Sequence, residues 1–122
     1  MISGRVSLEN NLPYARVGLV VHGNTIYLEF VLDTGFSGDL KIDGQTAAEL
    51  GMDIAPSGAR FINANGERIF VAVVYGFAEM ESRRAPIKIL VGNGVPLAGS
   101  GLFSVFGYTV VVNYKNKTAY LE

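Results

Sequence analysis

The sequence predicts an all-β fold whose strands close into a barrel or pack as a sandwich, together with one or two short helices. Seven or eight segments rich in β-branched and aromatic residues alternate with turn-forming Gly, Asn, Pro and Ser. Only two segments have the pattern of a short helix. The length of 122 residues suits one domain, and no linker or low-complexity segment interrupts residues 1–122.

The first two strands are predicted in residues 15–35, ARVGLVVHGNTIYLEFVLDTG. Gly23 and Asn24 readily adopt the positive φ that a tight hairpin needs, so they are expected to join these strands. Alternation along the second strand places successive side chains on opposite faces. One face carries Ile26, Leu28, Phe30 and Leu32, and the other carries Tyr27, Glu29, Val31 and Asp33. Asp33 therefore leaves the strand on the less uniformly apolar face.

A helix of about two turns is predicted in residues 44–52, GQTAAELGM. Thr46 is expected to cap its N-terminus, because Glu49 follows three residues later as in a capping box. Gly51 is expected to end the helix.

The next segment, RFINANGERIFVAVVYGFAEME, contains the strongest hairpin signal of the chain at Asn65 and Gly66. Another strand is expected at residues 85–92. Arg83, Arg84 and Lys88 are expected to be solvated residues of a loop.

The remaining sequence repeats the earlier order of elements. Residues 93–99 are rich in glycine, SGLFSVF (100–106) predicts a helical turn, and two last strands flank a turn at residues 115–117. A hairpin, a strand, a turn of small residues and a short helix thus occur twice. This faint duplication predicts two similar halves.

Composition excludes several functional classes. Ten Lys and Arg against eleven Asp and Glu leave a net charge of −1, which favours neither nucleic acid nor an anionic membrane. The absence of cysteine and the single histidine, His22, exclude disulfides and the usual zinc sites, so no metal or other cofactor is expected. No apolar run approaches the ~18 residues of a membrane span, and no signal-peptide core is evident, so a cytoplasmic location is expected.

The segment FVLDTGFSGDL, residues 30–40, places Asp33 between an apolar strand and a run of turn residues. Taken alone, this pattern is compatible with an ordinary turn in which the Asp33 side chain caps backbone amides. Other parts of the chain add to it, and they come in a set order. They are the strand into Asp33-Thr34-Gly35, a short helix, the Asn65-Gly66 hairpin, and Leu97-Ala98-Gly99 followed by a second short helix.

In these features the chain resembles the retropepsin-like aspartic proteases, in particular their small single-domain bacterial and archaeal branch. The resemblance covers about residues 17–122. It implies a closed β-barrel with one or two short helices, equivalent to half of a two-domain acid protease.

Peptide hydrolysis in this family needs two carboxylates that share one proton, because like charges in contact cannot both ionise. One carboxylate takes a proton from water while the other donates a proton to the carbonyl oxygen. Of the four aspartates, only Asp33 lies in the strand-then-turn setting. One chain thus supplies one catalytic carboxylate, which predicts a homodimer about a two-fold axis. The hydrophobic content of 49% is compatible with a buried subunit interface.

The resemblance implies roles for further residues. Thr34 would brace the two active-site loops across the dimer, and Gly35 would let the backbone approach a peptide or protein substrate. The hairpin of residues 62–71 would form a flap that closes over the substrate. The expected substrate-binding and flap residues are Phe36, Asn65, Gly66, Val95 and Leu97, and the element expected to pack beneath the catalytic loop is Leu97, Ala98 and Gly99.

Two serines depart from the retroviral branch, which commonly has an acid at the place of Ser37 and an arginine at the place of Ser100. The brace that this pair forms is absent here, so the dimer is expected to be weaker or held differently. The first interpretation of the sequence is an aspartic endopeptidase. The alternatives are a protease-like module that dimerises or binds peptides with little catalysis, and a small ligand-binding barrel in which Asp33 is only a turn residue.

Overall fold

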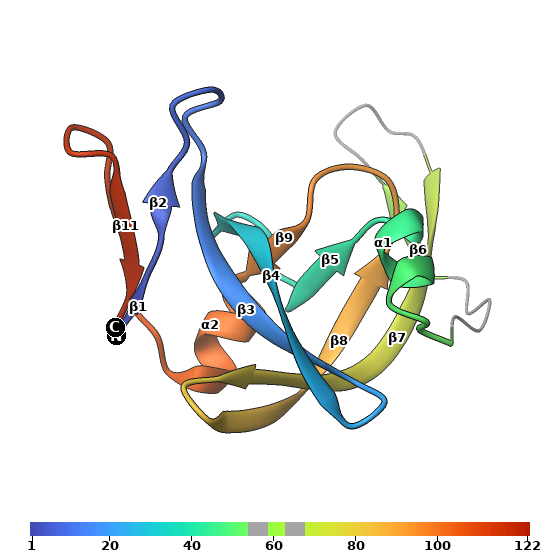
Figure 1. Ribbon diagram of the computed structural model, residues 1–122. Coiled ribbons are helices and arrows are strands. Elements are labelled where there is room, and N and C mark those ends of the chain that lie inside the picture. Colours follow the sequence, from blue (N-terminus) through green and yellow to red (C-terminus); the bar gives the residue numbers. More distant parts are fainter. Residues whose placement is uncertain (54–58, 63–67) are drawn as a thin grey trace.

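The computed structural model describes residues 1–53, 59–62 and 68–122, and it contains a closed barrel of six strands (Figure 1). The order around the barrel is β3-β4-β9-β5-β8-β7, and β7 closes it by pairing with β3. These strands are β3 (Pro13–Val21), β4 (Asn24–Asp33), β5 (Leu40–Ile42), β7 (Arg68–Met80), β8 (Arg83–Val91) and β9 (Leu97–Gly99). The predicted all-β barrel is confirmed.

The other strands of the described ranges lie at the edges. β2 (Arg5–Val6) pairs with β3, and β6 (Ala59–Ile62) pairs with β7. A separate three-stranded sheet has the order β1-β11-β10, made of Ile2–Ser3, Thr118–Leu121 and Val110–Asn113. The two C-terminal strands were predicted, whereas β1 and β2, with two residues each, carry too short a pattern to be recognised.

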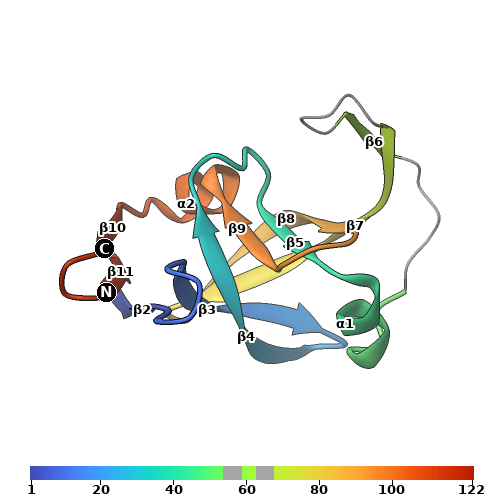
Figure 2. The same cartoon turned by 90° about the horizontal axis from the view of Figure 1, so that it is seen from above.

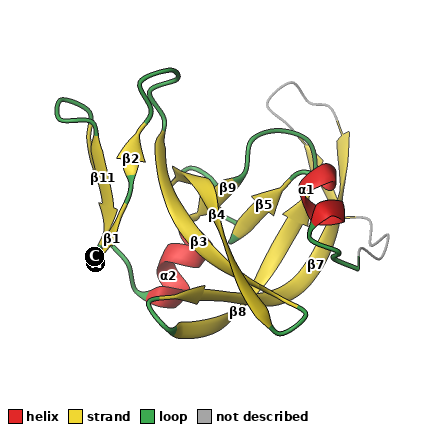
Figure 3. Cartoon of the chain, viewed as in Figure 1, coloured by secondary structure: helices red, strands yellow, loops and turns green. Residues whose placement is uncertain are grey.

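Both short helices are present, and one begins differently from the prediction (Figure 3). Helix α1 spans Gly44–Glu49, and its N-cap is Asp43, whose side chain accepts a hydrogen bond of 2.7 Å from the Thr46 N–H. The prediction of Thr46 as the cap was therefore wrong, because Asp43 has the extended backbone of a cap and Thr46 already lies inside the helix. Gly51, at φ 68°, follows the end of α1 as predicted.

Helix α2 spans Ser100–Phe106 and ends at Gly107, which has φ 73°. Within the described ranges, neither helix is long and apolar enough to cross a membrane.

Two tight turns differ from the predictions. The β3–β4 turn consists of His22 and Gly23, with φ 49° and 81°, so the turn lies one residue earlier than expected. The β7–β8 turn consists of Glu81 and Ser82, again with positive φ. Arg83, Arg84 and Lys88 are exposed, as expected, but they lie in strand β8, so the expectation of a loop there was wrong.

The strand pairing repeats itself within the chain, as the predicted duplication requires. The β3–β4 hairpin corresponds to the β7–β8 hairpin, and the parallel pair β4–β9 corresponds to the parallel pair β8–β5. The remaining pairs, β3–β7 and β5–β9, map onto themselves when the two halves are exchanged. The chain thus consists of two halves with the same topology.

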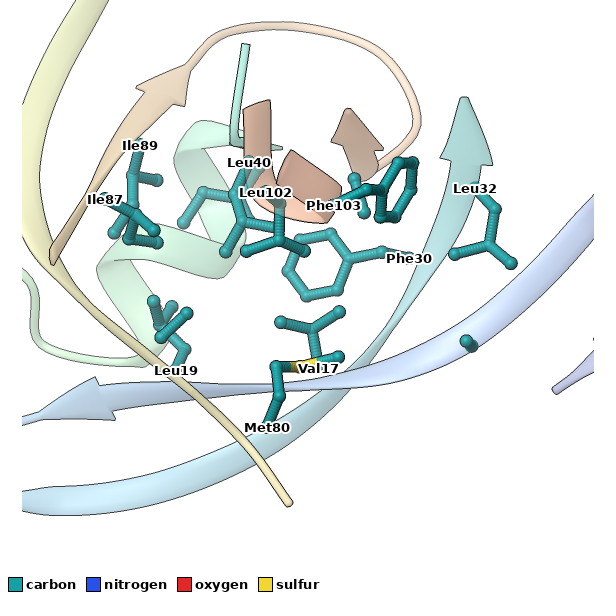
Figure 4. Packing of buried hydrophobic residues seen from close by; sticks show 14 of the residues in the cluster. Val17, Leu19, Phe30, Leu32, Leu40, Met80, Ile87, Ile89, Leu102 and Phe103 are labelled. Atoms are coloured by element: carbon teal, nitrogen blue, oxygen red, sulfur yellow. The ribbon is translucent and has the colours of Figure 1, made fainter. Parts of the chain in front are cut away.

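Apolar side chains from both halves fill the barrel (Figure 4). Phe30 of β4 and Leu40 of β5 are fully buried, and Leu102 of α2 lies beside them. Helix α2 therefore contributes to the core next to β9. The predicted inward face of β4 is confirmed, since all four of its apolar residues belong to the core or pack against it.

Barrel closure depends on a glycine. Gly18 of β3 stands opposite Glu79 of β7. A Cβ at Gly18 would lie 2.5 Å from the Glu79 carbonyl oxygen and 2.9 Å from Thr25 Cγ2. A larger residue would push β3 away from β7 at the point where the sheet closes.

Candidate active site

Asp33 is the last residue of β4, where the chain leaves the barrel wall. The parallel pairing of β4 with β9 places Asp33 opposite Gly99. The Gly35 N–H donates a hydrogen bond of 2.9 Å to Asp33 Oδ1, and the Phe36 N–H donates one of 3.1 Å to the Asp33 carbonyl. The side chain is half-buried, so Asp33 presents a carboxylate with a fixed orientation that solvent can reach.

The loop after Asp33 is held by backbone hydrogen bonds from β9 and the start of α2. The Ser100 N–H donates to the Phe36 carbonyl at 2.8 Å, and the Gly101 N–H donates to the Gly38 carbonyl at 3.1 Å. Figure 2 shows the end of β4, β9 and α2 next to one another. The structure thus brings the Asp33 loop and the Leu97-Ala98-Gly99 element together, as the sequence predicted.

Gly99 allows this close approach. A Cβ on Gly99 would overlap the Gly38 carbonyl oxygen and would lie 2.5 Å from the Phe36 carbonyl oxygen and 2.6 Å from Phe36 Cδ2. A Cβ on Gly38 would also collide with the Phe36 ring. Phe36 therefore packs against two glycines of its own site, and its predicted contact with substrate stays a prediction.

The other predicted site residues fall into three groups. Thr34 and Gly35 are exposed in the single chain. Val95 is 49% exposed, and Leu97 is half-buried in β9. The predicted flap tip, Asn65-Gly66, lies outside the described residues.

The two strands that flank this tip are described. β6 and β7 pair antiparallel, with Ile62 opposite Arg68, and Figure 2 shows β6 and the first part of β7 reaching outward from the barrel. The hairpin itself is thus confirmed on both sides of the tip.

One polar residue of this region, Asp39, was not predicted from the sequence. Its Oδ2 accepts a hydrogen bond of 2.8 Å from the Lys88 N–H, and its carbonyl accepts one of 2.9 Å from the Gly99 N–H. Asp39 thereby joins the end of the Asp33 loop to both β8 and β9. In the sequence it resembles any turn aspartate, because its partners are 49 and 60 positions away along the chain.

Three acidic side chains of the described residues have a lowered pKa. A hydrogen bond from Arg84 lowers the pKa of Glu79, and a hydrogen bond from the Tyr108 hydroxyl lowers that of Glu81. The Thr46 backbone N–H does the same for Asp43 at the start of α1. The described residues contain no cluster of acidic groups or histidine suited to a metal ion.

No protein-family model and no curated protein sequence matches the chain. Solved structures do match it. A retropepsin-like aspartic protease from Rickettsia conorii superposes with a TM-score of 0.69 and 21% identity, over 98% of this chain and 87% of that one. EIAV protease, in complex with the inhibitor HBY-793, superposes with a TM-score of 0.65 and 16% identity, over 87% of this chain and 98% of that one.

These superpositions span 87% or more of each chain, and both matching structures are proteases. The TM-scores of 0.69 and 0.65 establish a shared fold. At identities of 21% and 16% they do not establish a shared activity. The chain has the fold of the retropepsin-like aspartic proteases.

Proposed function

We propose that this protein is an aspartic endopeptidase that cleaves extended peptides as a homodimer, with one Asp33 from each copy in a shared site. The observation that carries the proposal is the position of Asp33 at the end of β4, in a loop held by β9 and the start of α2. A carboxylate that is oriented by a backbone N–H and still reached by solvent suits proton transfer to and from water.

A second copy is needed because one chain offers one suitable carboxylate. By the repeated strand pairing, the turn that matches the Asp33 loop is residues 92–96, GNGVP, which contains no acid. Asp39 and Asp43 lie at the end of neither β4 nor β8: Asp39 binds the Lys88 N–H of β8, and Asp43 caps helix α1. Two copies about a two-fold axis would bring their Asp33 side chains together.

The proposed mechanism uses these two carboxylates as acid and base. Two like charges in contact cannot both ionise, so the pair holds one proton. The ionised Asp33 takes a proton from a water molecule, whose oxygen bonds to the peptide carbonyl carbon, while the other Asp33 donates its proton to the carbonyl oxygen. The tetrahedral intermediate then breaks its C–N bond. The leaving nitrogen receives a proton from the carboxyl that gained one, and one hydroxyl of the intermediate gives its proton to the other carboxylate and becomes the new carbonyl, so the pair again holds one proton.

The substrate class follows from the β6–β7 hairpin. An arm that extends beyond the barrel can lie along an extended peptide and form strand-like hydrogen bonds with it. We therefore assign residues 62–71 as the flap, with Asn65 and Gly66 at its tip. Closure over the peptide would exclude water from the reaction.

The decisive test compares wild type with Asp33→Asn, which keeps the size of the side chain and removes its acid. Mass in solution should give a dimer for both proteins, and only wild type should cleave a diverse peptide library, with inhibition by pepstatin. Mixing equal amounts of the two chains, with free exchange, should leave about half of the wild-type activity, because mixed dimers hold only one Asp33. Equal cleavage by both proteins, or full activity from a monomer, would refute the proposal.

The hydrogen bonding of Ser100 favours a second candidate function, a module with little catalysis. Its hydroxyl donates to the Phe36 carbonyl of its own loop at 3.3 Å, so it is engaged within the chain. A dimer that holds its two Asp33 side chains less firmly would be a peptide-binding or dimerisation module with little catalysis. This candidate predicts that wild type and Asp33→Asn bind the same peptides and that neither cleaves them.

A further inference from the structure

We propose that Asp39 is a positioning residue for the catalytic loop, which its side chain attaches to strand β8 at the point where the first turn of α2 packs on it. The inference rests on the proposed peptidase function. It concerns a carboxylate that takes no part in the reaction and acts through the loop that carries Asp33.

Asp39 ends the loop that begins after Asp33, and it contacts two strands at once. Its side chain accepts a hydrogen bond of 2.8 Å from the Lys88 N–H of β8. Its carbonyl accepts a hydrogen bond of 2.9 Å from the Gly99 N–H of β9. The next residue, Leu40, is fully buried and begins β5 between the same two strands. Asp39 therefore fixes the point at which the loop re-enters the barrel.

The Asp39 carboxylate makes a contact with β8 that the backbone of β5 does not make at this point. The parallel pairing of β5 with β8 begins at Leu40 and Ile89, so the Lys88 N–H lies one residue before the ladder. Asp39 Oδ2 accepts from it and extends the contact between the two strands by one hydrogen bond. Hydrogen bonds to charged acceptors are stronger than neutral ones, which makes this a firm attachment for an exposed position.

Helix α2 leaves room for the carboxylate through a glycine. A Cβ on Gly101 would overlap Asp39 Oδ1 and would lie 3.0 Å from the Gly38 carbonyl oxygen. The first turn of α2 thus packs directly on the Asp39 side chain, and the Gly101 N–H holds the adjacent Gly38 carbonyl. Three elements, β8, β9 and α2, meet at this one residue.

The loop is consequently fixed at both ends. Asp33 is held at the start by the pairing of β4 with β9, and Asp39 is held at the end by β8. If the second attachment is lost, the loop exit can shift and carry the Asp33 carboxylate out of register with its partner. A misplacement of about 1 Å can reduce catalysis by roughly 10²-fold.

The test measures kcat and KM separately for wild type, Asp39→Ala and Asp39→Asn. Asp39→Ala should lower kcat by roughly ten- to a hundredfold and change KM by less than about threefold, because the side chain faces β8 and α2. Asp39→Asn keeps an oxygen acceptor for the Lys88 N–H and should restore kcat to within about fivefold of wild type. A purely structural role would lower the melting temperature of Asp39→Ala and leave its kcat unchanged below that temperature. This outcome would overturn the proposal.

Lys88→Ala is the matched control, because it removes the ammonium group and keeps the backbone N–H. It should leave kcat within about twofold of wild type. A loss as large as that of Asp39→Ala would assign the effect to a charge pair and overturn the proposal, as would an unchanged kcat in Asp39→Ala.

Amide hydrogen exchange tests the attachment without relying on activity. Asp39→Ala should accelerate exchange at the Lys88 and Gly35 amides, while amides of the β3–β4 hairpin stay as in wild type. If wild type cleaves no peptide but this exchange pattern is observed, the proposed function fails and the attachment stands. Unchanged exchange at both amides would overturn the positioning role.

Discussion

Replacing Gly99 by alanine would place a methyl group between β9 and the loop that carries Asp33. This methyl group would overlap the Gly38 carbonyl oxygen and would lie 2.5 Å from the Phe36 carbonyl oxygen. Ordinary contacts of this kind begin near 3.4 Å. The Phe36 carbonyl would have to retreat by roughly 1 Å to restore a normal contact.

This displacement should lower both the stability of the protein and its kcat. The Phe36 carbonyl accepts hydrogen bonds from the Ser100 N–H and hydroxyl, and both bonds would lengthen. Overpacking at a tight site costs about 1–3 kcal/mol, which corresponds to a melting temperature lower by roughly 4–15 °C for a domain of this size. A displacement of about 1 Å at the catalytic loop lowers kcat by roughly 10²-fold.

The assay pairs a thermal melt with peptide-cleavage kinetics below the melting temperature of the variant. Gly44→Ala is the matched control, because a Cβ at Gly44 meets no atom within 4 Å and Gly44 is the first residue of α1. It should keep full activity and gain up to about 1 kcal/mol from the higher helix propensity of alanine. A Gly99→Ala protein with the melting temperature and kcat of wild type would refute the close packing of β9 against the loop.

Three further outcomes follow from the fold. Gly18→Ala should destabilise the protein by about 1–3 kcal/mol in urea unfolding, because β3 and β7 would be forced apart; an unchanged midpoint would contradict this. Leu102→Ala, which empties a fully buried position of α2, should cost about 2–5 kcal/mol, and a loss below about 1 kcal/mol would show that α2 does not fill the barrel. Because Arg84 lowers the pKa of Glu79, that carboxylate stabilises the fold fully above its unfolded pKa of about 4.3 and loses this effect as the pH falls through its lower folded pKa. Glu79→Gln should therefore melt below wild type at pH 7 and together with it near pH 2; a melting difference that does not change with pH would contradict this.

The barrel and the main parts of the candidate site could be predicted because their signals are local. Alternation along β4 separates the inward face, which ends at Leu32, from the face that carries Asp33, and Gly and Asn mark the hairpins. The small residues Ala98 and Gly99 precede an apolar helical segment, which predicts a close approach followed by a helix. Each of these features occupies fewer than about fifteen residues, a length over which periodicity is informative.

The features that could not be predicted depend on distant partners or on unusual turn residues. Glu81 and Ser82 adopt positive φ without a glycine or asparagine, so the sequence does not mark the β7–β8 turn. Asp43 and Thr46 are both good caps, and only the backbone decides between them. The Asp39 side chain accepts its hydrogen bond from the Lys88 N–H, which lies 49 residues away in the sequence.

The two halves of the chain have the same topology and different tasks, and this difference explains why the proposed site needs a second copy. The first half ends β4 with an acid, whereas the second half ends β8 with Val91 and continues through a turn without an acid. Because β4–β9 and β5–β8 are parallel pairs, each half places its following strand beside the other half. The second half therefore supplies Gly99 as the surface on which the Asp33 loop rests. In the proposed peptidase the second half thus supports the Asp33 loop and adds no acid of its own, so the second carboxylate would come from another copy of the chain.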